Sequence, residues 1–379
     1  MVITSRRAEY GLIRSTLKEI LEHPELELDL VVTGEHLMDK HGKTINQIKN
    51  DGFMINNIIK AYPRRDDGYS MAYALGECIC ELVKVVKKDK PDIILVLTDL
   101  GPALAGAIVG SHMNIPVAHI HGGDVSGTID ESIRHATTKF SHIHFAASKK
   151  SADRIKQLGE EEWRIFTVGA PGLDEILHEK LLPKKYLFKK FNLDEKKPLI
   201  LVVQHPVTTE ADKAGEQMRI TLDALTEIDS QILILYPNSD SGSGDMIKII
   251  ERYSKKTNIH VFKNLERKIY LSFLKYSDVM VGNSSSGIIE APSFKTPVVN
   301  IGSRQQGRER AENVIDVDHD KKEILSAVKK ALYDDDFKEK IKRCKNPYGN
   351  GHAGEKIVEI LSKIEINEKL LNKKFCDIP

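Results

Sequence analysis

Cysteine is scarce in this sequence, and the spacing of the cysteines argues against a fold held together by zinc or by disulfide bonds. The four cysteines are Cys78, Cys80, Cys344 and Cys376. Cys78 and Cys80 are two positions apart in a segment with helical periodicity, where such neighbours do not share a face. The sequence therefore predicts neither a zinc site nor a disulfide framework.

Long apolar runs and an excess charge of one sign are also lacking. The start of the chain has no apolar stretch long enough for a signal peptide, and no later segment is long enough to span a bilayer. We therefore expect a cytoplasmic protein with no membrane partner. The formal net charge of +1 provides no long-range field for a polyanion, so we expect no nucleic acid partner and only local phosphate binding.

The sequence does contain a regular alternation of short apolar runs and amphipathic segments. With 379 residues, it exceeds the size at which one hydrophobic core keeps growing, which favours two domains. The first part predicts strands at 28–32, 93–97, 116–119 and 142–146, and helices at 10–21, 69–86 and 132–140. Because strands and helices alternate, we expect a parallel sheet.

A lysine-rich segment containing Pro183 interrupts this alternation, and a second series follows it. Strands are predicted at 199–203, 232–236, 259–262, 278–281 and 297–301, and helices at 210–228, 245–254 and 288–294. The fold class is therefore α/β, with two doubly wound, Rossmann-like domains. We expect domains at 1–178 and 198–362, a linker at 179–197, and a tail at 363–379 that returns to the first domain.

Polar and glycine residues follow the predicted strands in both series. Ligands of open α/β sheets bind beyond the carboxyl ends of the strands, so these residues predict a site in the cleft between the two domains. They are Asp99, His121, His205, Asn238, Asn283 and Gly302.

The turn from Gly282 to Gly287 is the strongest single motif. It reads Gly-Asn-Ser-Ser-Ser-Gly between a predicted strand and a predicted helix. Free N–H groups at a helix start bind phosphate oxygens, so Ser284 and Ser285 are candidates for holding a nucleotide diphosphate. Ordinary helix capping by these residues is the alternative interpretation.

Charged residues elsewhere suit the other parts of a nucleotide sugar. Arg7 and Arg304 would neutralise diphosphate charge, and Glu290 would accept hydrogen bonds from ribose hydroxyls. His205, after an apolar strand, would donate to a phosphate or carry a proton. The alternatives are a surface arginine for Arg7, a solvent-facing helix residue for Glu290 and a histidine satisfied by backbone groups for His205.

The segment from His119 to Asp130 is the candidate acid–base segment. Its paired glycines allow a tight turn against a ligand, and His121, Asp124 and Asp130 bracket that turn. Asp99 ends the neighbouring predicted strand and is expected to face the same space. Asp130 is equally suited to cap the helix that follows it.

These motifs, taken in order, resemble the hydrolysing UDP-N-acetylglucosamine 2-epimerase family, which includes bacterial sialic-acid precursor enzymes. The resemblance covers nearly the whole chain, from Arg7-Ala8-Glu9-Tyr10 through residues 127–136 to Lys373-Lys374-Phe375-Cys376. It implies a glycosyltransferase-B type fold, a homo-oligomer (dimer or tetramer), and no metal or cofactor. It also implies that UDP-N-acetylglucosamine and water give N-acetylmannosamine and UDP through a glycal intermediate.

The resemblance assigns roles to individual residues. It implies a catalytic set that includes Asp99 and Asp130, to which we add His121 and His205 as proton carriers. It implies UDP binding by the following residues: Arg7, His205, Asn238, Ser284, Ser285, Glu290 and Arg304.

Two positions depart from the family pattern. Many members have a glutamate where His121 stands and an arginine where Leu100 follows Asp99. A histidine still transfers protons near neutral pH, whereas loss of the arginine indicates another nucleotide sugar, for instance a 2,4-diacetamido-trideoxy sugar. A glycosyltransferase-B type sugar transferase and a non-catalytic UDP-sugar sensor are the alternative functions.

Overall fold

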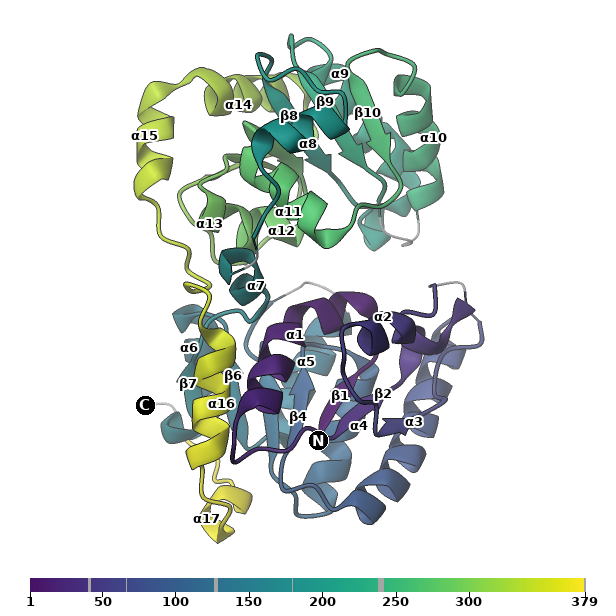
Figure 1. Cartoon of the computed structure of the whole chain (residues 1–379), viewed down its shortest axis with the longest axis vertical. Helices are drawn as coiled ribbons and strands as arrows, with labels where there is room; N and C mark the ends of the chain where they lie inside the picture. Colours follow the sequence, from purple (N-terminus) through teal and green to yellow (C-terminus); the bar gives the residue numbers. More distant parts are fainter. Residues whose placement is uncertain (40–41, 66, 126–128, 179, 238–241, 378–379) are drawn as a thin grey trace. The chain divides into compact units, whose positions relative to one another are not determined.

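The chain forms two α/β units in a computed structural model that describes residues 1–39, 42–65, 67–125, 129–178, 180–237 and 242–377 (Figure 1). The side chains of residues 129, 130, 177, 178 and 208 are outside this description. The first unit comprises residues 1–175 and 348–379, and the second comprises residues 176–347. No helix in the described ranges is long and apolar enough to cross a membrane.

The first unit contains a parallel sheet in the order β3-β2-β1-β4-β5-β6-β7. Its strands are β1 (Val2–Thr4), β2 (Leu30–Val32), β3 (Asn57–Ile58), β4 (Ile94–Leu97), β5 (Val117–Ile120), β6 (Ile143–Ala146) and β7 (Ile165–Thr167). Its helices are α1 (Arg7–Glu22), α2 (Ile45–Asn50), α3 (Gly68–Asp89), α4 (Gly101–His112), α5 (Ile129–Phe140), α6 (Lys149–Gln157), the start of α7 (Gly172–His178), α16 (Ala353–Lys363) and α17 (Glu368–Leu371), with 3₁₀ turns at Gly34–Leu37 and Glu162–Arg164.

Helices cover both faces of this sheet, which explains why its central strands are apolar without alternation. In β4, Leu95 and Leu97 pack toward the face that carries α1, α2 and α16. Ile94 and Val96 pack toward the opposite face, which carries α3 and α4. The predicted parallel sheet is confirmed.

The second unit contains a parallel sheet in the order β10-β9-β8-β11-β12-β13. Its strands are β8 (Leu199–Val203), β9 (Gln231–Leu235), β10 (Ile259–Phe262), β11 (Val279–Gly282), β12 (Val298–Ile301) and β13 (Val314–Val317). Its helices are α8 (Lys184–Lys190), α9 (Ala214–Leu225), α10 (Ser243–Tyr253), α11 (Arg267–Tyr276), α12 (Ser285–Ile289), α13 (Ala291–Phe294), α14 (Lys321–Tyr333) and α15 (Asp335–Arg343), with a 3₁₀ segment at Thr208–Lys213.

Two predicted helices of this unit are built differently. The segment predicted as one helix at 210–228 is a 3₁₀ segment followed by α9, because Glu210 has non-helical dihedral angles. The segment predicted at 288–294 is divided into α12 and α13 at Glu290, directly before Ala291 and Pro292. Proline lacks an N–H group for an intrahelical bond, so it starts a helix more readily than it continues one.

The segment expected as a linker belongs to the core of the second unit. Leu187 and Phe188 of α8 are buried against Leu201 and Phe273. Its high lysine content reflects a solvated helix face rather than a free connection.

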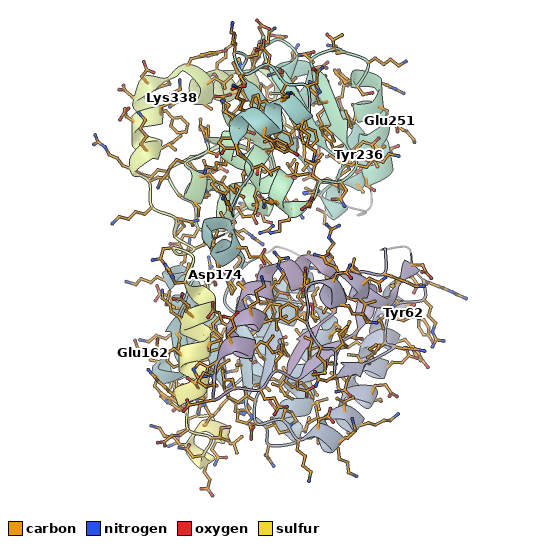
Figure 2. All side chains as sticks on the ribbon, viewed as in Figure 1. Tyr62, Glu162, Asp174, Tyr236, Glu251 and Lys338 are labelled. Carbon is orange, nitrogen blue, oxygen red and sulfur yellow. The ribbon has the colours of Figure 1, made fainter. Side chains whose placement is uncertain are left out.

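The chain returns to the first unit at Tyr348, fifteen residues before the expected start of the tail at 363. Helix α16 lies beside α1 (Figure 1). Asp174 of α7 accepts hydrogen bonds from the N–H groups of Ala353 (3.0 Å) and Gly354 (2.6 Å), and Figure 2 labels its position at the start of α16. A carboxylate at a helix N-terminus satisfies otherwise unpaired N–H groups, which anchors the returning helix.

Candidate active site

The first half-site is a cluster of four residues at the carboxyl edge of the first sheet, which we call the acid–base cluster: Asp99, His121, Asp124 and Arg134. Because β4 and β5 are adjacent and parallel, Asp99 and His121 follow neighbouring strand ends. Thr98 and His121 both have a left-handed backbone, with φ of 63° and 65°. Non-glycine residues adopt this conformation rarely, and such strain gathers at functional sites.

Arg134 of α5 holds this cluster together. Its guanidinium forms an ion pair with the Asp99 carboxylate, donates to the His121 carbonyl oxygen (3.0 Å) and lies 3.7 Å from Asp124 Oδ2. All four residues are at least nine-tenths buried. Buried charges are unfavourable unless they are paired, so Arg134 provides the charge that permits two carboxylates here.

Asp124 joins His121 to the neighbouring helix α6. His121 Nδ1 lies 3.4 Å from Asp124 Oδ2, and the Ser151 hydroxyl donates to Asp124 Oδ1 at 2.6 Å. Burial acts to raise the pKa of Asp124, but the His121 hydrogen bond, the Arg134 charge and the Ser151 hydroxyl outweigh it and hold this pKa well below its usual range. Asp124 is therefore a carboxylate at neutral pH.

The N-terminus of α1 lies at the same sheet edge, because β1 is the other neighbour of β4. Arg7 is the first residue of α1 and is exposed. Glu9 is buried and accepts from the N–H (2.6 Å) and hydroxyl (2.9 Å) of Ser5. Burial raises the pKa of Glu9 to about 7 despite these hydrogen bonds. Glu9 thus fixes the turn from which Arg7 projects.

Two predicted site residues are only partly or not at all described. Asp130 is the second residue of α5, whose first residue is Ile129, so the helix already includes it; its side chain is outside the described part. Asn238 lies outside the described residues.

The second half-site is the turn that follows β11, which we call the Asn283 turn (Gly282–Ser286). Gly282 has φ 134°, and a Cβ atom there would overlap the Val203 carbonyl oxygen, so only glycine fits. Asn283 and His205 form two reciprocal hydrogen bonds, His205 N–H to Asn283 Oδ1 (2.7 Å) and Asn283 Nδ2 to the His205 carbonyl (2.8 Å). Arg304 donates to the Asn283 carbonyl at 3.2 Å. The ends of β8, β11 and β12 are thereby joined.

Ser284 caps α12 and accepts from the Ser286 N–H at 3.3 Å. The capping interpretation is therefore correct for Ser284, and Ser285 is the first helical residue beside it. A capped helix start still presents N–H groups outward, so capping does not exclude an anion.

Glu290 is buried, and the solvent-facing alternative for it is wrong. One carboxylate oxygen pairs with Arg267 at 2.9 Å, and the other accepts from the Ser286 hydroxyl, which itself accepts from the Tyr270 hydroxyl. Glu290 therefore ties α11 to the Asn283 turn.

His205 is half-buried at the end of β8. Burial, aided by the positive charge of Arg304, lowers the pKa of His205 to about 4. The imidazole is therefore neutral at physiological pH and is suited to hydrogen bonding.

The structure thus places Arg7, Asp99 and His121 at one sheet edge of the first unit. It places His205, Ser284, Ser285, Glu290 and Arg304 at one sheet edge of the second. Sequence reasoning gave no role to Arg134, Ser151, Arg267 or Tyr270. The position of Arg134 four residues after Asp130, on the same helix face, was the available signal. Among described residues, no group of three His, Cys, Asp or Glu side chains is arranged to hold a metal.

Two parallel α/β sheets with polar residues gathered at their carboxyl edges define a protein with a glycosyltransferase-B type fold. Among solved structures, the chain is similar to the UDP-GlcNAc 2-epimerase of Neisseria meningitidis bound to UDP-GlcNAc, with a TM-score of 0.75 at 19% identity over 96% of this chain and 99% of that one. A putative UDP-N-acetylglucosamine 2-epimerase of Listeria monocytogenes gives a TM-score of 0.78 at 18% identity over 95% of both chains. The predicted fold is confirmed.

Sequence comparisons specify the family. The UDP-N-acetylglucosamine 2-epimerase family matches residues 18–362. The chain is 42% identical to the UDP-N,N'-diacetylbacillosamine 2-epimerase (hydrolyzing) of Legionella pneumophila, over 98% of this chain and 97% of that one. It is 31% identical to the UDP-N-acetylglucosamine 2-epimerase of Neisseria meningitidis, over 100% and 98%. The chain belongs to the UDP-N-acetylglucosamine 2-epimerase family, as a hydrolysing nucleotide-sugar 2-epimerase.

Proposed function

We propose that this enzyme hydrolyses a UDP-linked 2,4-diacetamido-2,4,6-trideoxyhexose and inverts its C2 configuration. The observation that carries this choice is Leu100, a half-buried aliphatic side chain directly after Asp99. A 6-deoxy sugar presents a methyl group at C6 where N-acetylglucosamine presents a hydroxymethyl group, and an aliphatic neighbour suits a methyl group. Relatives from Legionella pneumophila (42% identical) and Campylobacter jejuni (34% identical) are named for diacetylbacillosamine.

UDP-N-acetylglucosamine is the second candidate substrate. It is the substrate that the family resemblance implies, and the Neisseria meningitidis relative at 31% identity is named for it. The two candidates share the nucleotide and the reacting C1 and C2 atoms. They differ in the groups at C4 and C6, so the acid–base chemistry is the same for both.

The proposed scheme gives different roles to the acid–base cluster and to the Asn283 turn. In the first step the C1–O bond breaks, its electron pair leaves with UDP, and the C2 proton passes to a base as the C1–C2 double bond of a glycal forms. Water then adds its hydroxyl to C1, and a proton reaches C2 on the face that gives the epimer. In the second unit, the leaving diphosphate is held by His205, Arg304 and the Asn283 turn, where Ser284 and Ser285 donate.

In this scheme the acid–base cluster stabilises charge and transfers a proton on the sugar. Departure of UDP places positive charge on the ring, and the carboxylates Asp99 and Asp130 stabilise it. His121 transfers the proton at C2. Arg134 pairs with the Asp99 carboxylate and orients it. In the second unit, Glu290 accepts hydrogen bonds from the ribose hydroxyls in this scheme. Arg267 and Ser286 position its two carboxylate oxygens.

The test is incubation with each UDP-sugar in D₂O, followed by product identification. We expect free 2-epimer, one UDP per sugar and deuterium at C2, with the trideoxy sugar turned over at least tenfold faster. Sugar release only with an added acceptor would indicate a glycosyltransferase, and binding without UDP release would indicate a sensor. Faster turnover of UDP-N-acetylglucosamine would overturn the choice of sugar alone. A nucleotide-soaked crystal with density away from both half-sites would overturn the site.

We also propose that the enzyme is a homo-oligomer whose subunits meet through α3. Tyr69, Tyr73 and Val83 are 79%, 54% and 40% exposed on this helix, and a patch of exposed apolar side chains is typical of an interface. The helix is self-complementary when antiparallel, because the aromatic pair at its start would meet Val83 and Lys87 near its end. Light scattering should show a dimer or tetramer, and Tyr73→Glu should yield monomers; a monomeric wild type would overturn this proposal.

A further inference from the structure

The two ring nitrogens of His121 have different environments. Nδ1 lies 3.4 Å from Asp124 Oδ2, whereas Nε2 is buried and has no hydrogen-bond partner among the described residues. The residue as a whole is 4% exposed. A buried polar atom without a partner is unfavourable by about 1–3 kcal/mol, and in a native structure it needs an explanation, of which a catalytic role is one.

His119, two residues earlier in β5, provides the contrast. It is fully buried, but its Nε2 lies 2.8 Å from the Thr98 carbonyl and its Nδ1 lies 3.2 Å from the Thr138 hydroxyl. Both ring nitrogens of His119 are therefore occupied, as expected of a structural histidine. Of these two histidines, His121 is the one that keeps a nitrogen for a further partner.

The backbone conformation of the loop after β5 brings His121 and Asp124 into contact. The His121 N–H donates to the Phe145 carbonyl at 3.0 Å, which fixes the left-handed turn at the end of β5. Gly123 has φ 75°, and a Cβ atom there would overlap the Ser151 carbonyl oxygen. The loop therefore packs tightly on α6, and this brings Asp124 within 2.6 Å of the Ser151 hydroxyl.

An ionised Asp124 accepts only, so it selects one form of the imidazole. The Nδ1 atom carries the proton and donates it to Asp124, which leaves a lone pair on Nε2. Ser151 and Arg134 occupy the other polar contacts of the carboxylate and prevent it from turning away.

We infer that Asp124 is a positioning residue that orients His121, and that His121 Nε2 is the atom that takes the C2 proton as UDP leaves. This inference rests on the proposed function. In the step, the C2–H bond breaks, the Nε2–H bond forms, and the C–H electron pair becomes the C1–C2 double bond while the C1–O pair leaves with UDP. The resulting imidazolium is stabilised by Asp124.

Other titratable or charged groups lie around His121 besides Asp124 in its own loop. Among the described residues they are Arg134 of α5, Asp99 after β4, His119 of β5 and Arg154 of α6.

Asp124→Asn is the decisive variant. Its amide can donate to Nδ1 and leave the proton on Nε2, so we expect kcat to fall at least about 10²-fold with KM changed less than about threefold. Asp124→Glu keeps a carboxylate and should recover part of the loss. Asp153→Asn, an exposed aspartate on α6, is the matched control and should behave as wild type. Ser151→Ala should act in the same direction as Asp124→Asn, but more weakly, and replaces it if that variant does not fold.

A substrate-independent measurement separates this inference from the proposed function. Nitrogen-15 NMR of the histidine rings, with His121 assigned from its loss in His121→Gln, should show the Nδ1–H form in wild type and its loss in Asp124→Asn. An unchanged ring form would overturn the positioning role. If wild type released no UDP from any nucleotide sugar, the proposed function would fail while the ring measurement still decided the role of Asp124.

Discussion

The two half-sites are held together by different forces. In the acid–base cluster, one buried arginine compensates two carboxylates, and the geometry depends on charge. In the Asn283 turn, a glycine and a side-chain amide join the ends of β8 and β11 through neutral hydrogen bonds. In the proposed reaction, the first cluster forms an imidazolium beside a positively charged sugar, which fixed charges stabilise, whereas the second binds a diphosphate, which N–H groups stabilise. Charge changes should therefore damage the first half-site, and backbone changes should damage the second.

The largest effect is expected from Arg134→Met. It leaves Asp99 and Asp124 buried without their cation, and breaking a buried pair this way typically destabilises a protein by about 3–5 kcal/mol. Trp163, the only tryptophan, belongs to the first unit, so its fluorescence during urea unfolding reports on that unit. Arg64→Met, in the same unit, removes an exposed arginine that pairs with Glu77 at 3.1 Å, and it should change stability by less than about 1 kcal/mol. Equal losses in both variants would contradict a charge-held cluster.

The Asn283 turn should instead be most sensitive to a change that alters its backbone conformation. Gly282→Ala places a methyl group onto the Val203 carbonyl and forces a left-handed alanine, so we expect a loss of about 2–4 kcal/mol and no detectable UDP binding. Gly244→Ala in α10 has free space around the new methyl and should be neutral or slightly stabilising. Hydrogen exchange at β8 and β11 measures the effect. Protection as in wild type would show that the turn tolerates a side chain.

Sequence patterns located these strand ends because buried parallel strands are short apolar runs, and the residue after each run lies at the same sheet edge. They did not reveal α4, which lacks an amphipathic pattern because α3, α5 and the sheet surround it. Gly106 packs against Ile3 and Val96 there, where a Cβ atom would be too close to both. The pairing of Arg134 with Asp99 spans 35 residues, so it depends on the adjacency of β4 and β5.

The stability of the first unit should depend on pH through Glu9, which lies on α1 at the same sheet edge as the acid–base cluster. Burial raises the pKa of Glu9 from its usual range to about 7, so the folded state binds a proton that the unfolded state releases. Stability from this group is therefore fully present below pH ~4.5 and is lost as pH rises through about 7, by up to about 3 kcal/mol. Glu9→Gln should flatten this dependence between pH 5 and 8 in the tryptophan-detected unfolding experiment. Glu22→Gln, at the exposed end of the same helix, should leave it unchanged.

The smallest effect is expected from Ser284→Ala, which separates helix capping by Ser284 from diphosphate binding by the same residue. Ser284→Ala removes a helix cap and should lower the stability of the second unit by about 1 kcal/mol. The matched control is Asp334→Ala, which removes the cap of α15, away from the Asn283 turn, and should lower stability similarly. If Ser284 also donates to a diphosphate, only Ser284→Ala should weaken UDP binding, by about tenfold in calorimetric titration. Equal UDP affinity in the two variants would show that Ser284 is only a helix cap and would leave the anion to the N–H groups of α12 and to Arg304.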